Sequence, residues 1–464
     1  MASPHGNGSA MTDDNSRPIA IVILAAGQGT RMKSTLHKVL HPVAGRPMLI
    51  GLIDELERAG AERIVVVTGA GGAAVEREAA RDTVVFARQA EQLGTAHAAL
   101  QAREALAGFA GDVLVCFGDV PLLRRTTVAR MQARLHEDDA PACVVLGFRP
   151  ADAKAYGRVI AGANGRIAKM VEYKDASDDE RAETLCNAGP VMARGGEIFD
   201  LLGRIGNANA QGEYYLPDLV TVASVDERAS AVVETGEAEV TGVNDRADLA
   251  RAEALWQADR RAEMMRSGVT LRDPDSVFFS FDTAIEEDAV VEPHVVFGPG
   301  VSVGRGAVIK SFSHLEGARV GEACVVGPYA RLRPGAVLGK GAKVGNFVEV
   351  KNATLGDGAK ASHLTYLGDA TVGAGANIGA GTITCNYDGF FKYNTVIGEG
   401  AFIGSNSALV APVAIGAGAI VAAGSVITGD VERDALAMAR GRQEQKTGWA
   451  KRFREAMQVR KDKR

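Results

Sequence analysis

The sequence has little of what disulfide scaffolds, zinc sites and membrane spans require. Its five cysteines among 464 residues are scattered, odd in number and free of C-x-x-C spacing. This pattern argues against a disulfide framework and a zinc site, and it favours a reducing, cytoplasmic setting. No apolar run approaches the roughly 20 residues that a membrane-spanning helix needs. We therefore expect a cytoplasmic protein with no membrane partner.

Charge of one sign is not in excess either. The net charge is −5, which argues against nucleic acid as the main partner. The basic segment 441–464 is predicted to be a solvated helix end rather than a surface for nucleic acid or lipid. Residues 1–17, rich in Gly, Ser, Asn and Asp and without an apolar core, are predicted to be a disordered leader. A length of 464 residues exceeds one ordinary core and predicts two or three domains.

The segment at residues 19–38 carries the clearest chemical signal. An apolar run at 19–24 predicts a buried strand, and after it come Gly27, Gly29, Arg31 and Lys38. Glycine lets backbone N–H groups approach an anion, and the two cations can neutralise phosphate oxygens. The pattern predicts a polyphosphate ligand at the end of the first strand, although a Gly-x-Gly corner that serves packing alone would look the same.

The segments that follow alternate between strand-like and helix-like patterns. Strands are predicted at 64–68, 84–86, 113–117 and 143–146, and helices at 49–59 and 95–107, with Thr95 as a natural N-cap. This alternation favours a mostly parallel sheet with helices on both faces. Asp119 follows a predicted strand, where open α/β sheets bind ligands, although an aspartate there can also cap a turn. Residues 247–267 are predicted to form a linking helix.

A six-residue repeat organises the second half of the chain. From about residue 285 an aliphatic or aromatic residue recurs every six positions, commonly before Gly, which predicts a parallel β-helix with one inward apolar side chain per hexad. The rhythm is interrupted at 384–395, a polar and aromatic segment predicted to form a loop.

Two cations stand out in this repeat. Leu332 and Val350 lie 18 residues apart and are followed by Arg333 and Lys351. If three hexads make one coil, the two cations stack roughly 4.8 Å apart. They would then repel by around 3 kcal/mol at an effective dielectric constant of about 20. A bound anion would relieve this repulsion, and so would splaying of both side chains into water.

The string LAAGQGTRMKSTLHK at 24–38 resembles the signature of nucleotidyltransferases that join a nucleoside triphosphate to a sugar 1-phosphate. With the later segments 155–158, 171–175, 187–189, 212–218 and 242–246 and the hexads, nearly the whole chain resembles the family of bifunctional N-acetylglucosamine-1-phosphate uridyltransferases and glucosamine-1-phosphate N-acetyltransferases. His37 stands where relatives usually have proline, and Phe117 where they often have tyrosine.

This resemblance implies an α/β chain of defined parts. A Rossmann-like nucleotidyltransferase domain with a mostly parallel sheet would occupy 18–246, the linking helix 247–267, a left-handed β-helix acetyltransferase domain 268–440 and a tail 441–464. It also implies a homotrimer, acetyl-coenzyme A as co-substrate and Mg²⁺ as cofactor. The enzyme would acetylate glucosamine 1-phosphate and then transfer UMP from UTP to N-acetylglucosamine 1-phosphate, giving UDP-N-acetylglucosamine for cell-wall precursors.

The same resemblance implies the site residues of the first domain. Asp119 and Asn244 would coordinate Mg²⁺. The residues that would hold UTP and the sugar 1-phosphate are Leu24, Ala25, Ala26, Gly27, Lys38, Gln89, Gly94, Thr95, Gly157, Glu172, Asn187 and Asn244.

It likewise implies the site residues of the second domain. His363 would take a proton from the sugar amino group, which suits an imidazole near neutral pH. Glucosamine 1-phosphate would be held by Arg333, Lys351, Tyr366, Asn377 and Lys392. Acetyl-coenzyme A would be bound by Ala380, Asn386, Tyr387, Ser405, Ala423 and Arg440.

Two other functions fit parts of the pattern. One is a single-activity sugar nucleotidyltransferase whose β-helix serves assembly or regulation. The other is a non-enzymatic scaffold with a nucleotide-sensing first domain.

Overall fold

The computed structural model describes residues 17–27, 29–153, 156–209 and 211–463. The chain forms two compact units, which meet in sequence between Asp259 and Arg260. The predicted leader lies outside the described residues except for Arg17, whose carbonyl oxygen accepts a hydrogen bond of 3.0 Å from Gln132 Nε2. Within the described residues, no helix is long and apolar enough to cross a membrane.

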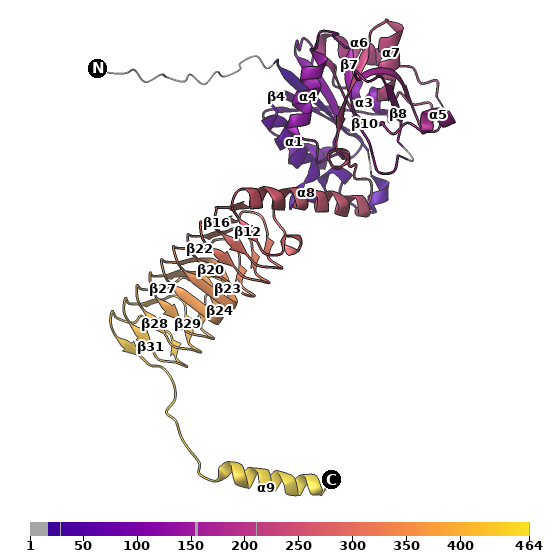
Figure 1. The fold of residues 1–464 in the computed structure, drawn as a ribbon. Coiled ribbons are helices and arrows are strands. Elements are labelled where there is room, and N and C mark those ends of the chain that lie inside the picture. Colours follow the sequence, from indigo (N-terminus) through magenta and orange to yellow (C-terminus); the bar gives the residue numbers. More distant parts are fainter. Residues whose placement is uncertain (1–16, 28, 154–155, 210, 464) are drawn as a thin grey trace, which may run out of the picture. The chain divides into compact units, whose positions relative to one another are not determined.

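The first unit is built on a nine-stranded sheet of order β5-β4-β1-β6-β10-β7-β11-β9-β8 (Figure 1). Strands β10 and β9 run against the others, so the sheet is mostly parallel, as predicted. Its strands are β1 (Ile19–Ala25), β4 (Ala61–Thr68), β5 (Val84–Arg88), β6 (Asp112–Phe117), β7 (Cys143–Phe148), β8 (Arg158–Ala161), β9 (Arg166–Val171), β10 (Cys186–Arg194) and β11 (Ser230–Thr235). The short strands β2 (Pro42–Val43) and β3 (Arg46–Pro47) form a separate hairpin.

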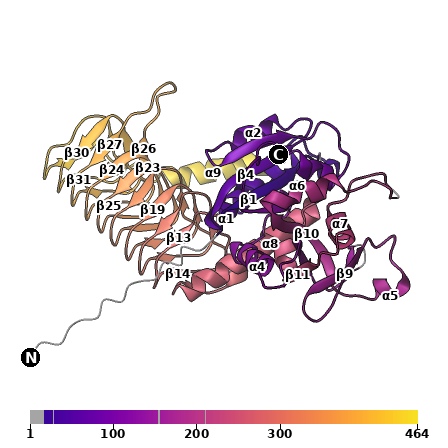
Figure 2. The same ribbon diagram turned by 90° about the horizontal axis from the view of Figure 1, so that it is seen from above.

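Helices cover both faces of this sheet (Figure 2). The helices are α1 (Met48–Arg58), α2 (Ala73–Ala79), α3 (Thr95–Leu100), α4 (Arg125–Leu135), α5 (Asp178–Arg181), α6 (Gly195–Gly203), α7 (Leu219–Val225) and α8 (Arg246–Arg266), with single turns η1 (Thr30–Met32), η2 (Lys38–Leu40), η3 (Leu216–Asp218) and η4 (Glu237–Val240). Alternate residues of β1 enter two separate cores. Ile21 packs in the core that α1 and α4 share, while Val22 packs in the core of α3, α6 and α7. Because successive side chains of a strand point to opposite faces, both faces are apolar and both are covered.

Two details of the predicted helix at 95–107 are wrong. Its regular part ends at Leu100, after which the chain continues in shorter i→i−3 hydrogen bonds. Gly94, not Thr95, is the N-cap, because the Thr95 hydroxyl instead accepts a 2.9 Å hydrogen bond from the backbone N–H of Leu216.

The second unit is a parallel β-helix of 22 short strands. Its strands are β12 (Thr270–Leu271), β13 (Ala284–Ile285), β14 (Val290–Val291), β15 (Val296–Phe297), β16 (Ser302–Val303), β17 (Val308–Ile309), β18 (His314–Leu315), β19 (Ala318–Val320), β20 (Val325–Val326), β21 (Arg331–Leu332), β22 (Ala336–Leu338), β23 (Lys343–Leu355), β24 (Lys360–Val372), β25 (Asn377–Ile378), β26 (Ile383–Cys385), β27 (Thr395–Ile397), β28 (Phe402–Ile403), β29 (Ala408–Val410), β30 (Val413–Ile415), β31 (Ile420–Val421), β32 (Val426–Ile427) and β33 (Leu436–Ala437). A single turn, η5 (Pro274–Ser276), precedes the coils, and helix α9 (Trp449–Asp462) follows them.

Strand register gives three hexads per coil. Leu315 pairs with Leu332, and Leu332 with Val350, so successive coils repeat after 17 or 18 residues. All three side chains are buried, as the hexad pattern predicts. Val372 pairs instead with Ile397, 25 residues on, because the predicted loop at 384–395 is inserted there.

One corner of the coils carries a ladder of aromatic side chains. His294, Phe312, Tyr329 and Phe347 stack in that order, with ring centroids 4.9, 4.9 and 5.3 Å apart. All four have positive φ, between 55° and 62°, a conformation that strains a bulky L-residue by roughly 1–2 kcal/mol. We call these four residues the aromatic corner.

Candidate active sites

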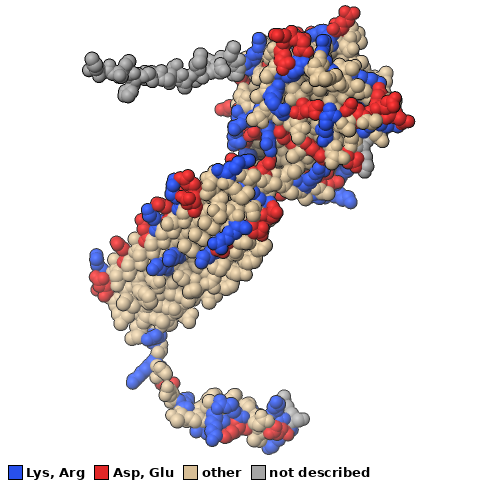
Figure 3. Space-filling model, in the orientation of Figure 1, with Lys and Arg blue, Asp and Glu red and all other residues tan. Residues whose placement is uncertain are grey.

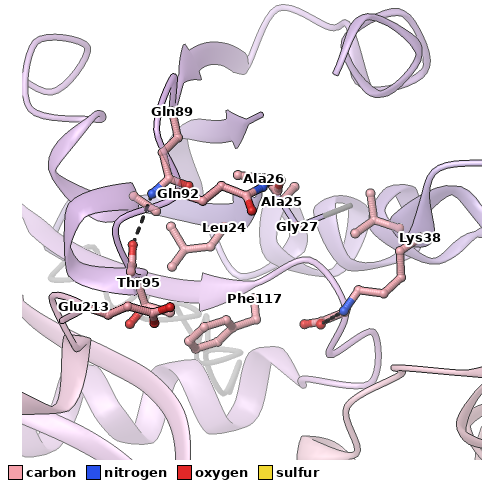
Figure 4. Close-up of a pocket in the computed structure, with 14 residues that line it drawn as sticks. Leu24, Ala25, Ala26, Gly27, Lys38, Gln89, Gln92, Thr95, Phe117 and Glu213 are labelled. Atoms are coloured by element: carbon pink, nitrogen blue, oxygen red, sulfur yellow. Dashed lines mark hydrogen bonds and ion pairs between the residues drawn. The ribbon is translucent and has the colours of Figure 1, made fainter. Parts of the chain in front are cut away.

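The first unit has a pocket of about 290 Å³ at the carboxyl ends of β1 and β6 (Figure 4). Most of the residues predicted to bind the nucleotide and metal line it: Leu24, Ala25, Ala26, Gly27, Lys38, Gln89, Gly94, Thr95 and Asp119. Gln89 is only 4% exposed, and its Nε2 donates to the Gly94 carbonyl oxygen at 3.2 Å. The carboxyl edge of the parallel strands is where α/β sheets bind ligands, and the predicted residues surround a pocket at this edge.

Two cations hold the side chains that were predicted to bind metal. Lys38 Nζ forms an ion pair with Asp119 Oδ2, and Arg31 Nη2 donates to Asn244 Oδ1 at 2.9 Å. The two segments are joined, since the backbone N–H of Val243 donates to the Asp119 carbonyl oxygen at 2.8 Å. Basic side chains and oxygen ligands therefore converge at one edge of the pocket.

These oxygen ligands fit Mg²⁺, which prefers oxygen and usually takes one or two carboxylates together with substrate phosphates. Within the described residues, no group of three or more His, Cys, Asp or Glu side chains could hold a metal ion. The oxygen atoms of Asp119 and Asn244 are the candidate metal ligands of this unit.

The predicted sugar-phosphate residues Gly157, Glu172 and Asn187 lie together, outside the lining of that pocket. The backbone N–H of Asn187 donates to the Gly157 carbonyl oxygen at 2.9 Å. A Cβ added to Gly157 would lie 3.1 Å from Glu172 Oε1, so a larger residue there would have to displace that carboxylate. Burial, with added repulsion from Asp218 and Asp175, raises the pKa of Glu172. The three residues form an acidic, partly buried recess with polar groups suited to sugar hydroxyls.

The predicted phosphate-binding cations of the second unit also converge. Arg333 lies one coil from Lys351, as predicted, because Leu332 pairs with Val350. The chain supplies a counter-charge, since Arg333 Nη1 forms a 2.8 Å ion pair with Glu349 Oε1. Contact with Lys392, with a smaller effect of Arg333, lowers the pKa of Lys351. Three cations thus lie together, with Glu349 paired to Arg333 and Asp369 close enough to act on Lys351 and Lys392.

His363 lies on the coil that follows the coil of Lys351, and Asn346 fixes the orientation of its imidazole ring. Its Nδ1 is 2.6 Å from Asn346 Oδ1, 17 residues earlier. An amide oxygen can only accept, so Nδ1 carries the proton and Nε2 is left as the basic nitrogen. The sequence analysis missed Asn346, although a 17-residue coil would have placed it beside His363.

The other residues predicted to form the site of the second unit lie on the coils and in the inserted loop. Asn386 Nδ2 donates to Asp369 Oδ2 at 2.5 Å, and a Cβ added to Gly368 would meet both Asn386 Nδ2, at 2.8 Å, and the Tyr366 hydroxyl. Asn377 pairs with Lys360 on one side and Phe402 on the other. Tyr387 is exposed in the inserted loop. Its backbone pairs with that of Lys392 in an isolated antiparallel β-bridge.

Ala380, Ser405 and Ala423 occupy equivalent places on three successive coils. The backbone N–H of Asn406 donates to the Ala380 carbonyl oxygen at 2.7 Å, and that of Gly424 to the Ser405 carbonyl oxygen at 2.8 Å. Arg440 Nη1 donates to the Ala423 carbonyl oxygen, also at 2.8 Å. Four of the six residues predicted to bind acetyl-coenzyme A, Ala380, Ser405, Ala423 and Arg440, therefore form a continuous column.

Several polar residues near these sites were not predicted. Gln92 and Glu213 line the nucleotide pocket, and Gln92 Nε2 donates to the Ala26 carbonyl oxygen at 2.9 Å. Phe117 lines it too. Asp369 binds both Asn386 and Asn352. Their contacts join segments far apart in sequence or on adjacent coils, and no local spacing signals them.

Comparison with known proteins places both units. The MobA-like NTP transferase domain family matches residues 21–171, and the bacterial transferase hexapeptide (six repeats) family matches 317–352 and 394–429. "Bifunctional protein GlmU" of Rhizorhabdus wittichii is 61% identical over 97% of this chain and 99% of its own length. The proteins of the same name from Novosphingobium aromaticivorans and Sphingopyxis alaskensis are 59% and 58% identical, each over 96% of this chain and 98% of their own length.

The chain belongs to the GlmU family. It is accordingly a bifunctional enzyme of UDP-N-acetylglucosamine synthesis, with a uridyltransferase and an acetyltransferase activity, as predicted. The left-handed β-helix that the family resemblance implies agrees with the hexapeptide match. The two alternative functions are thereby set aside. Nucleotide-sugar transfer of the GlmU kind is generally metal-dependent and acts on small molecules.

Proposed function

We propose that this enzyme acetylates glucosamine 1-phosphate with acetyl-coenzyme A in the second unit. The first unit then transfers UMP from UTP to N-acetylglucosamine 1-phosphate, using Mg²⁺ and releasing pyrophosphate. The product would serve peptidoglycan and lipopolysaccharide synthesis. The observation that carries the assignment of sites is the convergence of Lys38, Asp119, Arg31 and Asn244 in one unit, and of Arg333, Lys351 and Lys392 in the other.

In the first unit, two anions must approach each other. Like unit charges about 4 Å apart repel by about 4 kcal/mol at an effective dielectric constant of about 20. We assign Arg31 and Lys38 to the UTP phosphates, and Asp119 and Asn244 to the metal. Mg²⁺, when bound, would neutralise charge on the phosphates and on the departing pyrophosphate. The nucleotide would lie against Leu24, Ala25, Ala26 and Gly27. Its uracil base would lie next to Gln89, Gly94 and Thr95.

Gly157, Glu172 and Asn187 would hold the sugar phosphate, whose own phosphate oxygen attacks the α-phosphorus of UTP. No nucleophile from the protein is needed. The chain's part is to bind, orient and neutralise.

In the second unit, His363 would be the general base. Its Nε2 would accept a proton from the sugar amino group as that nitrogen attacks the thioester. Arg333, Lys351 and Lys392 would hold the phosphate, assisted by Tyr366 and Asn377. The column Ala380, Ser405, Ala423, with Arg440, Asn386 and Tyr387, would bind acetyl-coenzyme A.

We further propose a homotrimer. The aromatic corner supports it, since Phe312, Tyr329 and Phe347 are about half exposed despite their size. In the view of Figure 3 much of the β-helix surface is uncharged, although a few Lys or Arg side chains lie within this face as well as along its margins. A ladder of strained, exposed aromatic rings gains stability only if another chain covers it.

Steady-state assays on the purified chain test the assignment. Release of pyrophosphate from UTP and N-acetylglucosamine 1-phosphate should require Mg²⁺, and a free thiol should form from acetyl-coenzyme A and glucosamine 1-phosphate. The variants Asp119→Asn and His363→Ala should each abolish one reaction and leave the other intact. If the Asp119→Asn variant kept the wild-type rate and metal dependence of uridylyl transfer, the assignment of Asp119 to the metal would be wrong.

A further inference from the structure

Arg158, the first residue of β8, is a buried cation that no proposed role uses. It is only 3% exposed. Within the described part of the chain, no carboxylate lies within ion-pair distance of its guanidinium. Burying a charge without a counter-charge is unfavourable unless hydrogen bonds compensate fully, so the contacts that this guanidinium makes must matter to the fold around it.

Those contacts reach the segments of Tyr156, Tyr173 and Cys186, and also the backbone of Arg181. Arg158 Nη1 donates to the Tyr156 carbonyl oxygen, and Nε and Nη2 both lie 3.3 Å from the Arg181 carbonyl oxygen. Nη1 is 3.8 Å from Cys186 Sγ. The guanidinium carbon lies 5.3 Å from the centre of the Tyr173 ring, a cation–π distance. The planar fork is thus fixed on several sides at once.

The segments of Tyr156, Tyr173 and Cys186 each carry one residue of the proposed sugar-phosphate site. Gly157 lies between Tyr156 and Arg158, Glu172 precedes Tyr173, and Asn187 follows Cys186. Strand pairing supports the same grouping, because Arg158 pairs with Val171 and with Cys186. The buried guanidinium therefore contacts a sequence neighbour of each of the three residues.

We propose that Arg158 is the positioning residue of the sugar-phosphate half of the uridyltransferase site. It holds the segments of Gly157, Glu172 and Asn187 at fixed separations and does not contact substrate itself. This inference rests on the proposed function of that site. The nucleotide pocket is lined by other segments, at the ends of β1 and β6 and around Gln89, so the effect of Arg158 is confined to one of the two substrates.

The test separates the two Michaelis constants in the full-length enzyme. In Arg158→Met the KM for N-acetylglucosamine 1-phosphate should rise about 10-fold or more, because displaced binding groups lose much of their interaction. The KM for UTP should change less than about twofold. Arg158→Lys keeps a cation over Tyr173 but loses the fork, and its KM for the sugar phosphate should fall between those of the wild type and Arg158→Met.

Arg181→Met is the matched control. The Arg181 side chain lies over the same ring, 5.1 Å from its centre, but is more exposed. Arg158 uses only the Arg181 backbone carbonyl, which the substitution keeps. The sugar-phosphate KM of this variant should stay within about twofold of the wild type.

The outcomes separate this inference from the proposed function. If the wild-type enzyme forms no UDP-N-acetylglucosamine, the proposed function fails. If it does, and Arg158→Met leaves the sugar-phosphate KM unchanged, only the role of Arg158 is wrong. Equal rises in both KM values, or an equal effect of Arg181→Met, would also overturn it by showing a general packing role. Because Arg158 lies in the first unit, an unchanged KM for UTP reports that this unit is intact. If Arg158→Met does not fold, Arg158→Lys decides by the same criterion.

Discussion

Among single side chains, Glu172 has the environment that most directly sets a pH dependence. Burial, and then repulsion from Asp218 and Asp175, raises its pKa. As the pH falls through that raised pKa, Glu172 gains a proton and no longer accepts hydrogen bonds as a carboxylate. We therefore expect the KM for N-acetylglucosamine 1-phosphate to rise on the acidic side, at a higher pH than an ordinary glutamate would give.

Asp218→Asn tests this cause. Removing the neighbouring charge should move the rise in KM to lower pH, as measured by uridyltransferase KM between about pH 4.5 and 8. Asp226→Asn is the control, because Asp226 is paired with Arg204 and does not act on Glu172. An unshifted KM profile in Asp218→Asn would show that Glu172 does not govern sugar-phosphate binding.

Asn346 is the second residue whose role can be isolated. Its amide oxygen accepts from His363 Nδ1 at 2.6 Å and so presents Nε2 as the base. Asn346→Ala should lower kcat for acetyl transfer by roughly 10-fold or more, since a misoriented base transfers protons poorly. Asn346→Asp keeps an acceptor at this place and should lose less. Uridylyl transfer should not change in either variant, and an Asn346→Ala enzyme with full acetyltransferase kcat would exclude an orienting role.

At the level of elements, the sequence predicted those strands and coils whose apolar residues recur at a regular spacing or in a continuous run. The hexads predicted the β-helix, because each inward side chain marks one face. With the three hexads per coil that the resemblance implies, they placed Arg333 one coil from Lys351. In the first unit the apolar runs predicted β1, β4, β5, β6 and β7. Strands β8, β9, β10 and β11 were not predicted; β8 and β9 carry no clear two-residue period.

The same limit applies to the sites. Gly157, Glu172 and Asn187 came from resemblance, because they lie next to or in three strands, β8, β9 and β10, whose pairing no local pattern shows. Arg158 could not be found from sequence, as its partners are the carbonyl oxygens of Tyr156 and Arg181 and the ring of Tyr173. A basic residue at the start of a strand would ordinarily be placed in solvent.

The aromatic corner is an element whose role can be tested. Phe347 is 57% exposed and has φ of 57°. Phe347→Asp places a charge in the proposed interface without straining the chain, because aspartate tolerates this conformation better than phenylalanine. We expect a loss of the species of about three times the 48.5 kDa chain mass in sedimentation, together with weaker acetyl transfer and unchanged uridylyl transfer.

Val225→Asp controls for this change. Val225 is 73% exposed in the first unit, so the substitution adds the same charge at an exposed apolar position away from the corner. It should leave the sedimenting species unchanged. If Phe347→Asp sediments as the wild type does, another surface must hold the chains together.

For the whole molecule, the division into two compact units implies that the two reactions are independent in chemistry and linked only by their shared intermediate. Lys38 and Asp119 belong to the first unit, and His363 and Asn346 to the second. Asp119→Asn should lower uridylyl transfer by roughly 100-fold or more because it weakens metal binding. His363→Ala should do the same to acetyl transfer, and each variant should keep its other activity.

These two variants allow complementation. Supplied with glucosamine 1-phosphate, acetyl-coenzyme A and UTP, neither alone should make UDP-N-acetylglucosamine at an appreciable rate. Mixed in equal amounts, they should make it after a lag, because N-acetylglucosamine 1-phosphate must leave one molecule and bind another. Wild-type enzyme at the same total concentration gives the reference rate. A mixture that forms no product, although each variant retains its single activity, would show that the intermediate cannot pass between molecules and that the two units do not act independently.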